Sequence, residues 1–222
     1  MPGYPLILEL NDRLAVVVGG GAVGRRKVEG LLTAGARVRL ISRNPVPPAC
    51  WRDPVEFHQR PFHPADLDGA VLAFAATGIA EVDAEVLAAA RARGIPANLA
   101  TLPETGDFSV PAVLRRGDLL VAVGTGGHAP ALAGIVRDRL ATVLGPEWAL
   151  LVAIAARLRR QKLTAGDEPD YYYKVLVELL EVGLAELLVR REESAIDQLL
   201  TRVCGRETSL AGLGLTLPDP TP

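Results

Sequence analysis

The chain has 222 residues, of which 49% are hydrophobic and 23% are charged, a balance that excludes a largely disordered protein. Its 24 basic and 26 acidic residues give a net charge of −2, and only 5% of the residues are aromatic. A nucleic-acid-binding surface needs excess positive charge and often aromatic stacking platforms, so we expect no nucleic-acid partner.

In the first half of the chain, short β-branched apolar runs alternate with stretches of helical periodicity. We predict strands at Leu14–Val18, Val38–Ile41, Val55–Phe57, Val71–Ala75 and Ile95–Leu99, and helices at Val23–Ala34 and Asp83–Arg93. Such alternation is typical of a parallel sheet with helices on its faces. The fold class is therefore α/β, with an N-terminal Rossmann-type parallel sheet over residues 1–112.

The second half is mainly helical. We predict one strand at Leu119–Val123 and helices at Ala129–Leu144, Trp148–Leu163, Tyr171–Arg190 and Ser194–Val203. Apolar residues surround most of the circumference of Tyr171–Arg190, so this helix needs partners on more than one side, and a second subunit is one candidate. Residues 113–203 are thus expected to form a helical dimerisation domain, and residues 204–222 a mobile tail.

A glycine-rich loop follows the first strand directly and opens the first helix. Gly19, Gly21 and Gly24 satisfy the pattern G-x-G-x-x-G. In this context the first glycine permits a tight turn, the second lets a pyrophosphate approach the backbone, and the third allows close packing of helix on strand. The loop predicts a dinucleotide site; the alternative is a glycine turn that binds nothing.

The end of the second strand bears on the choice of dinucleotide. An acidic residue there usually binds the ribose 2′-hydroxyl and favours NAD, but the sequence runs from Ile41 through Ser42 and Arg43 to Asn44. Arg43 is able to accommodate a 2′-phosphate, so NADP stays open beside NAD. A solvated loop arginine explains the residue equally well.

Five segments together resemble the family of precorrin-2 dehydrogenases and the N-terminal module of siroheme synthases. They are Val16–Lys27 (VVVGGGAVGRRK), Ala73–Thr77 (AFAAT), Ala97–Pro103 (ANLATLP), Phe108–Pro111 (FSVP) and Leu119–Pro130 (LLVAVGTGGHAP). The resemblance extends over about residues 1–200, and no methyltransferase domain is expected after it.

The resemblance implies oxidation of the tetrapyrrole precorrin-2 to sirohydrochlorin with NAD, in a homodimer. Ala22, Val23, Arg43, Asn44 and Thr77 would contact the cofactor. Some members also insert ferrous iron, so a bifunctional enzyme or a ferrochelatase is one alternative. A non-catalytic module that binds dinucleotide or tetrapyrrole is another.

One position departs from the family pattern. The family has an aspartate shortly after the fifth strand, credited with acid–base or metal-insertion work, and Thr101 stands there instead. A threonine hydroxyl is a poor general base because its pKa lies far above neutral. Asp107 is the nearest carboxylate in sequence and is our candidate catalytic residue; a cap or loop aspartate is the alternative.

A second glycine turn is expected to contact the carboxylates of the substrate. Thr125, Gly126, Gly127 and His128 precede a helix, where exposed backbone N–H groups suit anions. His128 has a titratable ring, with a solvent-facing loop histidine as the alternative. By resemblance, Asn98 and Arg116 complete the substrate-binding set.

Further features indicate the compartment and the metal content. Two distant cysteines outside any C-x-x-C motif favour a reducing compartment, and the N-terminus lacks a signal-peptide pattern, so we expect a cytoplasmic protein. Glycines and Pro130 interrupt the long uncharged stretch Leu119–Val136, which argues against a membrane span. His58 and His63 are spaced poorly for a metal, and no metal site is predicted.

Overall fold

The computed structural model describes residues 3–44, 55–102, 105–165, 169–205 and 208–218. The chain divides into two compact units, one of Met1–Val110 with Gly126–His128 and the other of Pro111–Thr125 with Ala129–Pro222. The first contains a parallel sheet, and the second contains a hairpin and five helices among its described residues.

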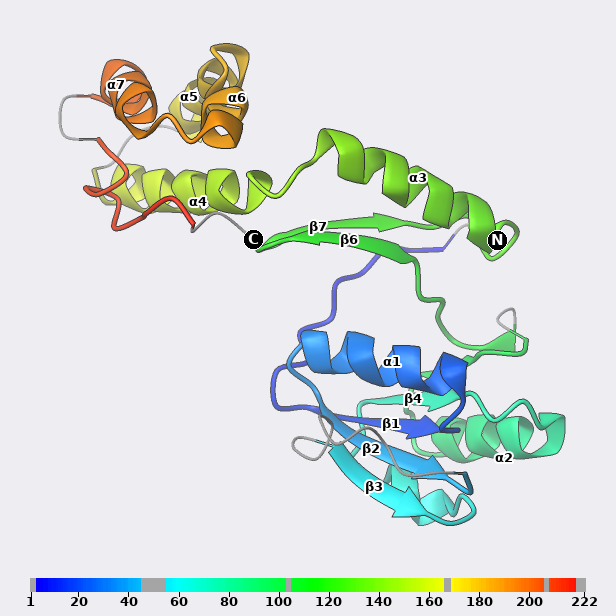
Figure 1. Ribbon diagram of the computed structural model, residues 1–222. Helices are drawn as coiled ribbons and strands as arrows, with labels where there is room; N and C mark the ends of the chain where they lie inside the picture. Colours follow the sequence, from blue (N-terminus) through cyan, green and yellow to red (C-terminus); the bar gives the residue numbers. More distant parts are fainter. Residues whose placement is uncertain (1–2, 45–54, 103–104, 166–168, 206–207, 219–222) are drawn as a thin grey trace. The chain divides into compact units, whose positions relative to one another are not determined.

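The first unit is built on five parallel strands in the order β3-β2-β1-β4-β5 (Figure 1). Its elements are β1 (Leu14–Val18), α1 (Ala22–Thr33), β2 (Arg37–Ser42), β3 (Val55–Gln59), the short 3-10 helix η2 (Pro64–Leu67), β4 (Leu72–Ala75), α2 (Ala80–Arg91) and β5 (Ala97–Leu99). The α/β class and the parallel sheet predicted from the apolar runs are confirmed.

Alternate residues of the central strands point to opposite faces of the sheet, as strand geometry requires. Val17 packs with Val28 of α1 on one face, whereas Val16 packs with Val86 of α2 on the other. Because helices cover both faces, the central strands are apolar throughout, and β1 reads Leu-Ala-Val-Val-Val. This packing fixes the carboxyl ends of β1 and β4 beside each other.

The second unit begins with an antiparallel hairpin and continues with helices. Its elements are β6 (Ala112–Arg116), β7 (Leu119–Val123), α3 (Pro130–Val143), α4 (Trp148–Ala165), α5 (Pro169–Glu181), α6 (Leu184–Arg190) and α7 (Glu193–Cys204). The sequence pattern did not reveal β6, which pairs with β7 from Ala112↔Val123 to Arg116↔Leu119. A mainly helical C-terminal region is confirmed.

One prediction about the helical region is wrong. The single helix expected over Tyr171–Arg190 is broken between α5 and α6, where Gly183 adopts φ +97°, a conformation that favours glycine. The tail expected to be mobile over 204–222 is packed in part: Leu210 is fully buried and Leu213 is 3% exposed, both within the helical core. Residues 206–207 and 219–222 lie outside the described residues.

Candidate functional site

A crevice of about 420 Å³ opens at the carboxyl ends of the parallel strands. The chain leaves β1 toward β2 and β3 on one side and later places β4 and β5 on the other, so the crossover direction reverses between β1 and β4. Ligands of open α/β sheets bind outside such a switch point. Gly19, Gly21, Arg43, Asn44 and Thr77, all predicted cofactor contacts, line this crevice.

The glycine loop is held tightly against the sheet. Gly19 has φ +115°, and a Cβ atom there would overlap the carbonyl oxygen of Ala76. A Cβ on Gly24 would in turn overlap the carbonyl oxygen of Gly19, so Gly24 lets α1 pack against the loop rather than lining the crevice. The roles predicted for these two glycines, tight turn and close packing, match this geometry.

The N-terminus of α1 is open toward solvent. Its N-cap is Gly21, with no side-chain hydrogen bond to the helix and no acidic residue in the first turn. A Cβ on Gly21 would have no neighbour within 4 Å, and Ala22 and Val23 are exposed. The first N–H groups of a helix lack intrahelical partners and carry partial positive charge, so this end offers donors to an anion.

Polar contacts at the end of β2 fix the side of the crevice next to the glycine loop. The hydroxyl oxygen of Ser42 accepts hydrogen bonds from the backbone N–H groups of Gly20 at 3.2 Å and Asn44 at 3.1 Å. The guanidinium of Arg25 donates to the carbonyl oxygen of Gly20 at 3.0 Å. Arg43 is exposed there.

A buried carboxylate that sequence reasoning missed lies behind the end of β4. Asp83 of α2 is 1% exposed and accepts hydrogen bonds from the backbone N–H and the hydroxyl of Thr77, at 3.1 and 2.6 Å. Its other oxygen accepts the hydroxyl of Thr101 at 3.2 Å. The only sequence signal for Asp83 was its place in the first turn of the helix that follows Ala-Ala-Thr. An acidic residue there is equally well explained by its favourable interaction with the helix dipole.

Asp107, the candidate catalytic residue, binds structural groups with both carboxylate oxygens. One accepts the backbone N–H of Ala97 at 2.9 Å, and the other accepts Nε and Nη2 of Arg91 at 3.2 and 3.1 Å. Asn98, the buried neighbour on β5, donates its side-chain amide to the carbonyl oxygen of Phe108 at 2.9 Å. Both side chains fasten the segment after β5 to the sheet.

The remaining predicted substrate residues also have local partners. Arg116 donates to the carbonyl oxygens of Leu144 at 2.8 Å and Ala141 at 3.4 Å, where it satisfies the C-terminal end of α3. The hydroxyl of Thr125 accepts the N–H of Ala129 at 3.2 Å. Gly126 and Gly127 have positive φ, and His128 is exposed.

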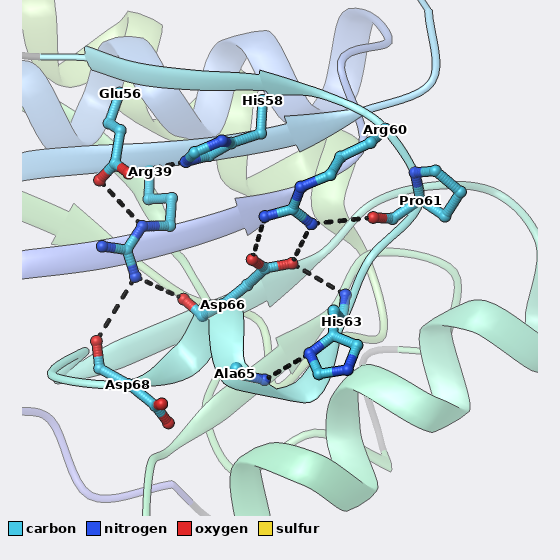
Figure 2. Close-up of polar contacts among 9 residues, drawn as sticks. All are labelled: Arg39, Glu56, His58, Arg60, Pro61, His63, Ala65, Asp66 and Asp68. Carbon is cyan, nitrogen blue, oxygen red and sulfur yellow. Dashed lines mark hydrogen bonds and ion pairs between the residues drawn. The ribbon is translucent and has the colours of Figure 1, made fainter.

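His58 and His63, which are spaced poorly for a metal, both take part in a network of ion pairs and hydrogen bonds (Figure 2). Arg60 pairs with the buried Asp66 through two hydrogen bonds of 2.9 and 2.5 Å. His63 donates its backbone N–H to Asp66, and Nε2 of His58 lies 2.6 Å from the carboxylate of Glu56. These groups line a hollow of about 670 Å³ and bind one another.

The pKa of Asp66 reflects this network. Burial acts to raise the pKa, but hydrogen bonds from Arg60 and from the N–H of His63, together with the charge of Arg60, outweigh it. The pKa therefore lies below its usual value of 3.8. The carboxylate is charged at neutral pH and supports the segment from β3 to η2.

The described residues lack two further kinds of feature, a metal-binding cluster and a single membrane-spanning helix. The described residues contain no group of three or more His, Cys, Asp or Glu side chains placed to bind a metal ion. No single helix among them is long and apolar enough to cross a membrane; Pro130–Val143 and Trp148–Gln161 reach that standard only as a pair bent by 71°.

Comparisons with known proteins extend this description. Residues 6–112 match a protein-family model described as "Putative NAD(P)-binding". A siroheme synthase of Methylobacillus flagellatus is 36% identical over 99% of this chain and 49% of its own length, and siroheme synthase 1 of Halorhodospira halophila is 34% identical over 93% and 44%. The chain thus spans about half the length of these curated relatives.

A solved structure shares the architecture. The chain named "SirC, precorrin-2 dehydrogenase" superposes with a TM-score of 0.68 over 90% of this chain and 98% of its own, at 20% sequence identity. At that identity the likeness establishes the fold.

Proposed function

We propose that this chain belongs to the siroheme synthase and precorrin-2 dehydrogenase family and oxidises precorrin-2 to sirohydrochlorin with NAD as the hydride acceptor. The observation that carries the proposal is the crevice at the switch point, where Gly19, Gly21 and Thr77 converge beside an uncapped helix. The matched relatives support the substrate, and the family model supports the cofactor.

The residues present fit a dinucleotide. A pyrophosphate needs open N–H donors without a side chain or negative charge in front of them, and the N-terminus of α1 provides both conditions at Gly21. The close contacts of Gly19 with Ala76 and of Gly24 with Gly19 hold the loop against the end of the sheet, so a ligand can approach its backbone closely. When bound, the nicotinamide supplies the acceptor for the hydride.

The chain's own residues orient this ligand. Ser42 ties Gly20 to Asn44 and so sets the distance between the loop and the end of β2. Arg43 lies exposed at the end of β2, where it would border the adenosine ribose of NAD and would pair with the 2′-phosphate if NADP bound instead. The alignment of hydride donor and acceptor supplies much of the catalysis.

The proposal includes assembly and location. The chain acts as a homodimer in the cytoplasm, where the NAD pool is available. Exposed apolar side chains on the late helices support the dimer: Tyr173 is 70% and Val189 62% exposed. Light scattering of the purified protein tests the dimer, and a monomer at micromolar concentration would contradict it.

Cell fractionation tests the proposed cytoplasmic location.

The deciding experiment mixes purified protein with precorrin-2 and NAD. We expect sirohydrochlorin absorbance and NADH to appear in equal amounts. Tight NAD binding without turnover would replace the proposal with a binding module, and the absence of both would overturn it. Boiled protein controls for spontaneous oxidation, which yields sirohydrochlorin without NADH.

A further inference from the structure

The strongest unassigned feature is the buried carboxylate of Asp83. Three donors converge on it from two segments: the N–H and hydroxyl of Thr77 after β4, and the hydroxyl of Thr101 after β5. Among the described residues no cation forms an ion pair with Asp83, although it is 1% exposed. A buried charge held only by neutral donors is costly, so it calls for an explanation beyond packing.

The bonding pattern fixes how the Thr101 hydroxyl is oriented. An ionised carboxylate only accepts hydrogen bonds, so Thr101 must donate its hydrogen to Oδ2 of Asp83. The lone pairs of the Thr101 oxygen are then not used by Asp83 and can accept a hydrogen bond. Thr101 is exposed whereas Asp83 is buried, so a ligand meets the hydroxyl and not the carboxylate.

Thr101 follows β5 beside the segment after β4, which lines the crevice through Thr77. β4 and β5 are neighbours in parallel register, with Ala75 opposite Leu99, so the segments that follow them emerge together. Thr77 lines the crevice. Thr101 also stands at the position where the resembling family has an aspartate. The carboxylate of Asp83 is therefore hydrogen-bonded to the residue that replaces the family aspartate.

We propose that Thr101 and Asp83 together replace that single aspartate, with Asp83 a positioning residue that acts through Thr101. The inference rests on the proposed function. As precorrin-2 gives a hydride, with its bonding electron pair, to NAD, the proton lost from the macrocycle binds the oxygen of Thr101. The original hydroxyl proton passes to Asp83, so Thr101 remains a hydroxyl and Asp83 becomes neutral. After the product leaves, the proton returns to solvent by the reverse path: Asp83 gives it back to the oxygen of Thr101, whose exposed hydroxyl releases a proton to water.

Asp107 is a weaker candidate for this role. Its two oxygens hold the N–H of Ala97 and the guanidinium of Arg91, which fasten the loop to β5. Asp83 also holds structural donors through one oxygen, but its other oxygen has only the exposed hydroxyl of Thr101. The comparison between variants of these two aspartates is therefore informative.

The test begins with Asp83→Asn. The amide oxygen still accepts the donors of Thr77, but the amide nitrogen now donates to Thr101 and reverses its polarity. We expect normal folding and NAD affinity, an unchanged KM for precorrin-2, and a kcat lower by about a hundredfold.

Matched variants separate positioning from folding. Thr101→Val removes the hydroxyl and should lower kcat like Asp83→Asn, whereas Thr101→Ser should keep kcat within about threefold. The double variant Asp83→Asn with Thr101→Asp places a carboxylate at the family position and should restore activity. If Asp83→Asn does not fold, the kcat values of Thr101→Val and Thr101→Ser still test whether the hydroxyl of Thr101 is required.

The outcomes that overturn the inference differ from those that overturn the function. A wild type that turns over precorrin-2 while Asp83→Asn and Thr101→Val keep its kcat and pH profile refutes the inference alone. A larger loss in Asp107→Asn than in Asp83→Asn refutes it as well. A wild type without turnover refutes the proposed function and the inference together.

Discussion

Gly24 of α1 lies so close to Gly19 of the loop after β1 that a Cβ atom on Gly24 would overlap the carbonyl oxygen of Gly19. The Gly19 carbonyl is a backbone group, so it cannot move out of the way by changing a side-chain rotamer. The loop and the helix are therefore one rigid piece, and the position of the helix N-terminus depends on a missing methyl group. The contrast with the open position of Gly21 allows the two roles of these glycines to be tested separately.

The first prediction concerns stability. Gly24→Ala should lower the free energy of unfolding by about 3 kcal/mol, because the added methyl group has to displace the backbone of Gly19. Gly30→Ala is the matched control on the same helix: nothing lies within 4 Å of its Cβ, so stability should stay equal or rise by about 0.5–1 kcal/mol. Urea unfolding measures both. Equal midpoints for Gly24→Ala and the wild type would contradict the packing argument.

The second prediction concerns the cofactor. Gly21→Asp places a favourable N-cap on α1, because Gly21 already has φ −71° and ψ −178°, an extended conformation open to any residue. The protein should be as stable as before or more so, while NAD affinity falls at least about tenfold, since the carboxylate occupies the phosphate position. Gly30→Asp adds the same charge away from the N-terminus and should bind NAD normally. Calorimetry decides; unchanged affinity in a folded Gly21→Asp refutes the site.

The third prediction concerns the choice between dinucleotides. Arg43 is exposed at the end of β2 and lines the crevice, so its guanidinium can pair with a 2′-phosphate but has no charged partner on NAD. Arg43→Ala should weaken NADP binding by about tenfold and leave NAD binding within about threefold. Arg26→Ala, an exposed residue of α1 outside the crevice lining, controls for overall charge. Equal losses for the two dinucleotides would contradict the assignment.

The fourth prediction concerns pH. Because the pKa of Asp66 is lowered in the folded protein, its charged form contributes stability above the usual value of 3.8, and this contribution is lost as the pH falls below it. Asp66→Asn should unfold at a lower urea concentration than the wild type at pH 7, and the difference should shrink in acid. Glu56→Gln, in the half-exposed pair with Arg39, should have a small effect at either pH. A difference for Asp66→Asn that persists at pH 2 would refute the account.

The fifth prediction concerns the C-terminal segment. Leu210 is fully buried against the helical core, and its backbone N–H donates to Asp197 at 2.7 Å. Leu210→Ala should cost about 2–4 kcal/mol of stability through lost contacts and a cavity. Leu6→Ala, at a position 71% exposed, is the control with little expected effect. A loss of under 1 kcal/mol for Leu210→Ala would restore the view of a mobile tail.

Local patterns predicted much of the first unit. The apolar run of β1, the glycines after it and the helix from Ala22 to Thr33 are encoded by neighbouring residues, so their positions in the structure agree with the predictions to within about a residue or two. The hairpin partner β6 was missed because its residues, Ala-Val-Leu-Arg-Arg, lack a clear alternation, and a strand of that kind is defined by its pairing with β7.

The helical region shows where periodicity is insufficient. Tyr171–Arg190 has a continuous apolar pattern, yet the left-handed turn at Gly183 breaks it so that α5 and α6 pack on each other and on α7. The segment after Gly205 ends in Pro-Asp-Pro-Thr-Pro and was predicted to be mobile, but Leu210 and Leu213 from this segment are buried in the helical core. Burial depends on neighbours far along the chain, which a local pattern does not contain.

The sequence by itself determined the strand–helix alternation, the glycine loop and the family resemblance, because each is a property of residues close together along the chain. Only the tertiary structure placed a buried carboxylate behind the end of β4. Thr77, Asp83 and Thr101 meet because β4 and β5 are parallel neighbours and α2 returns across their ends. No spacing rule brings residues 77, 83 and 101 together, since their contact depends on how the sheet is ordered.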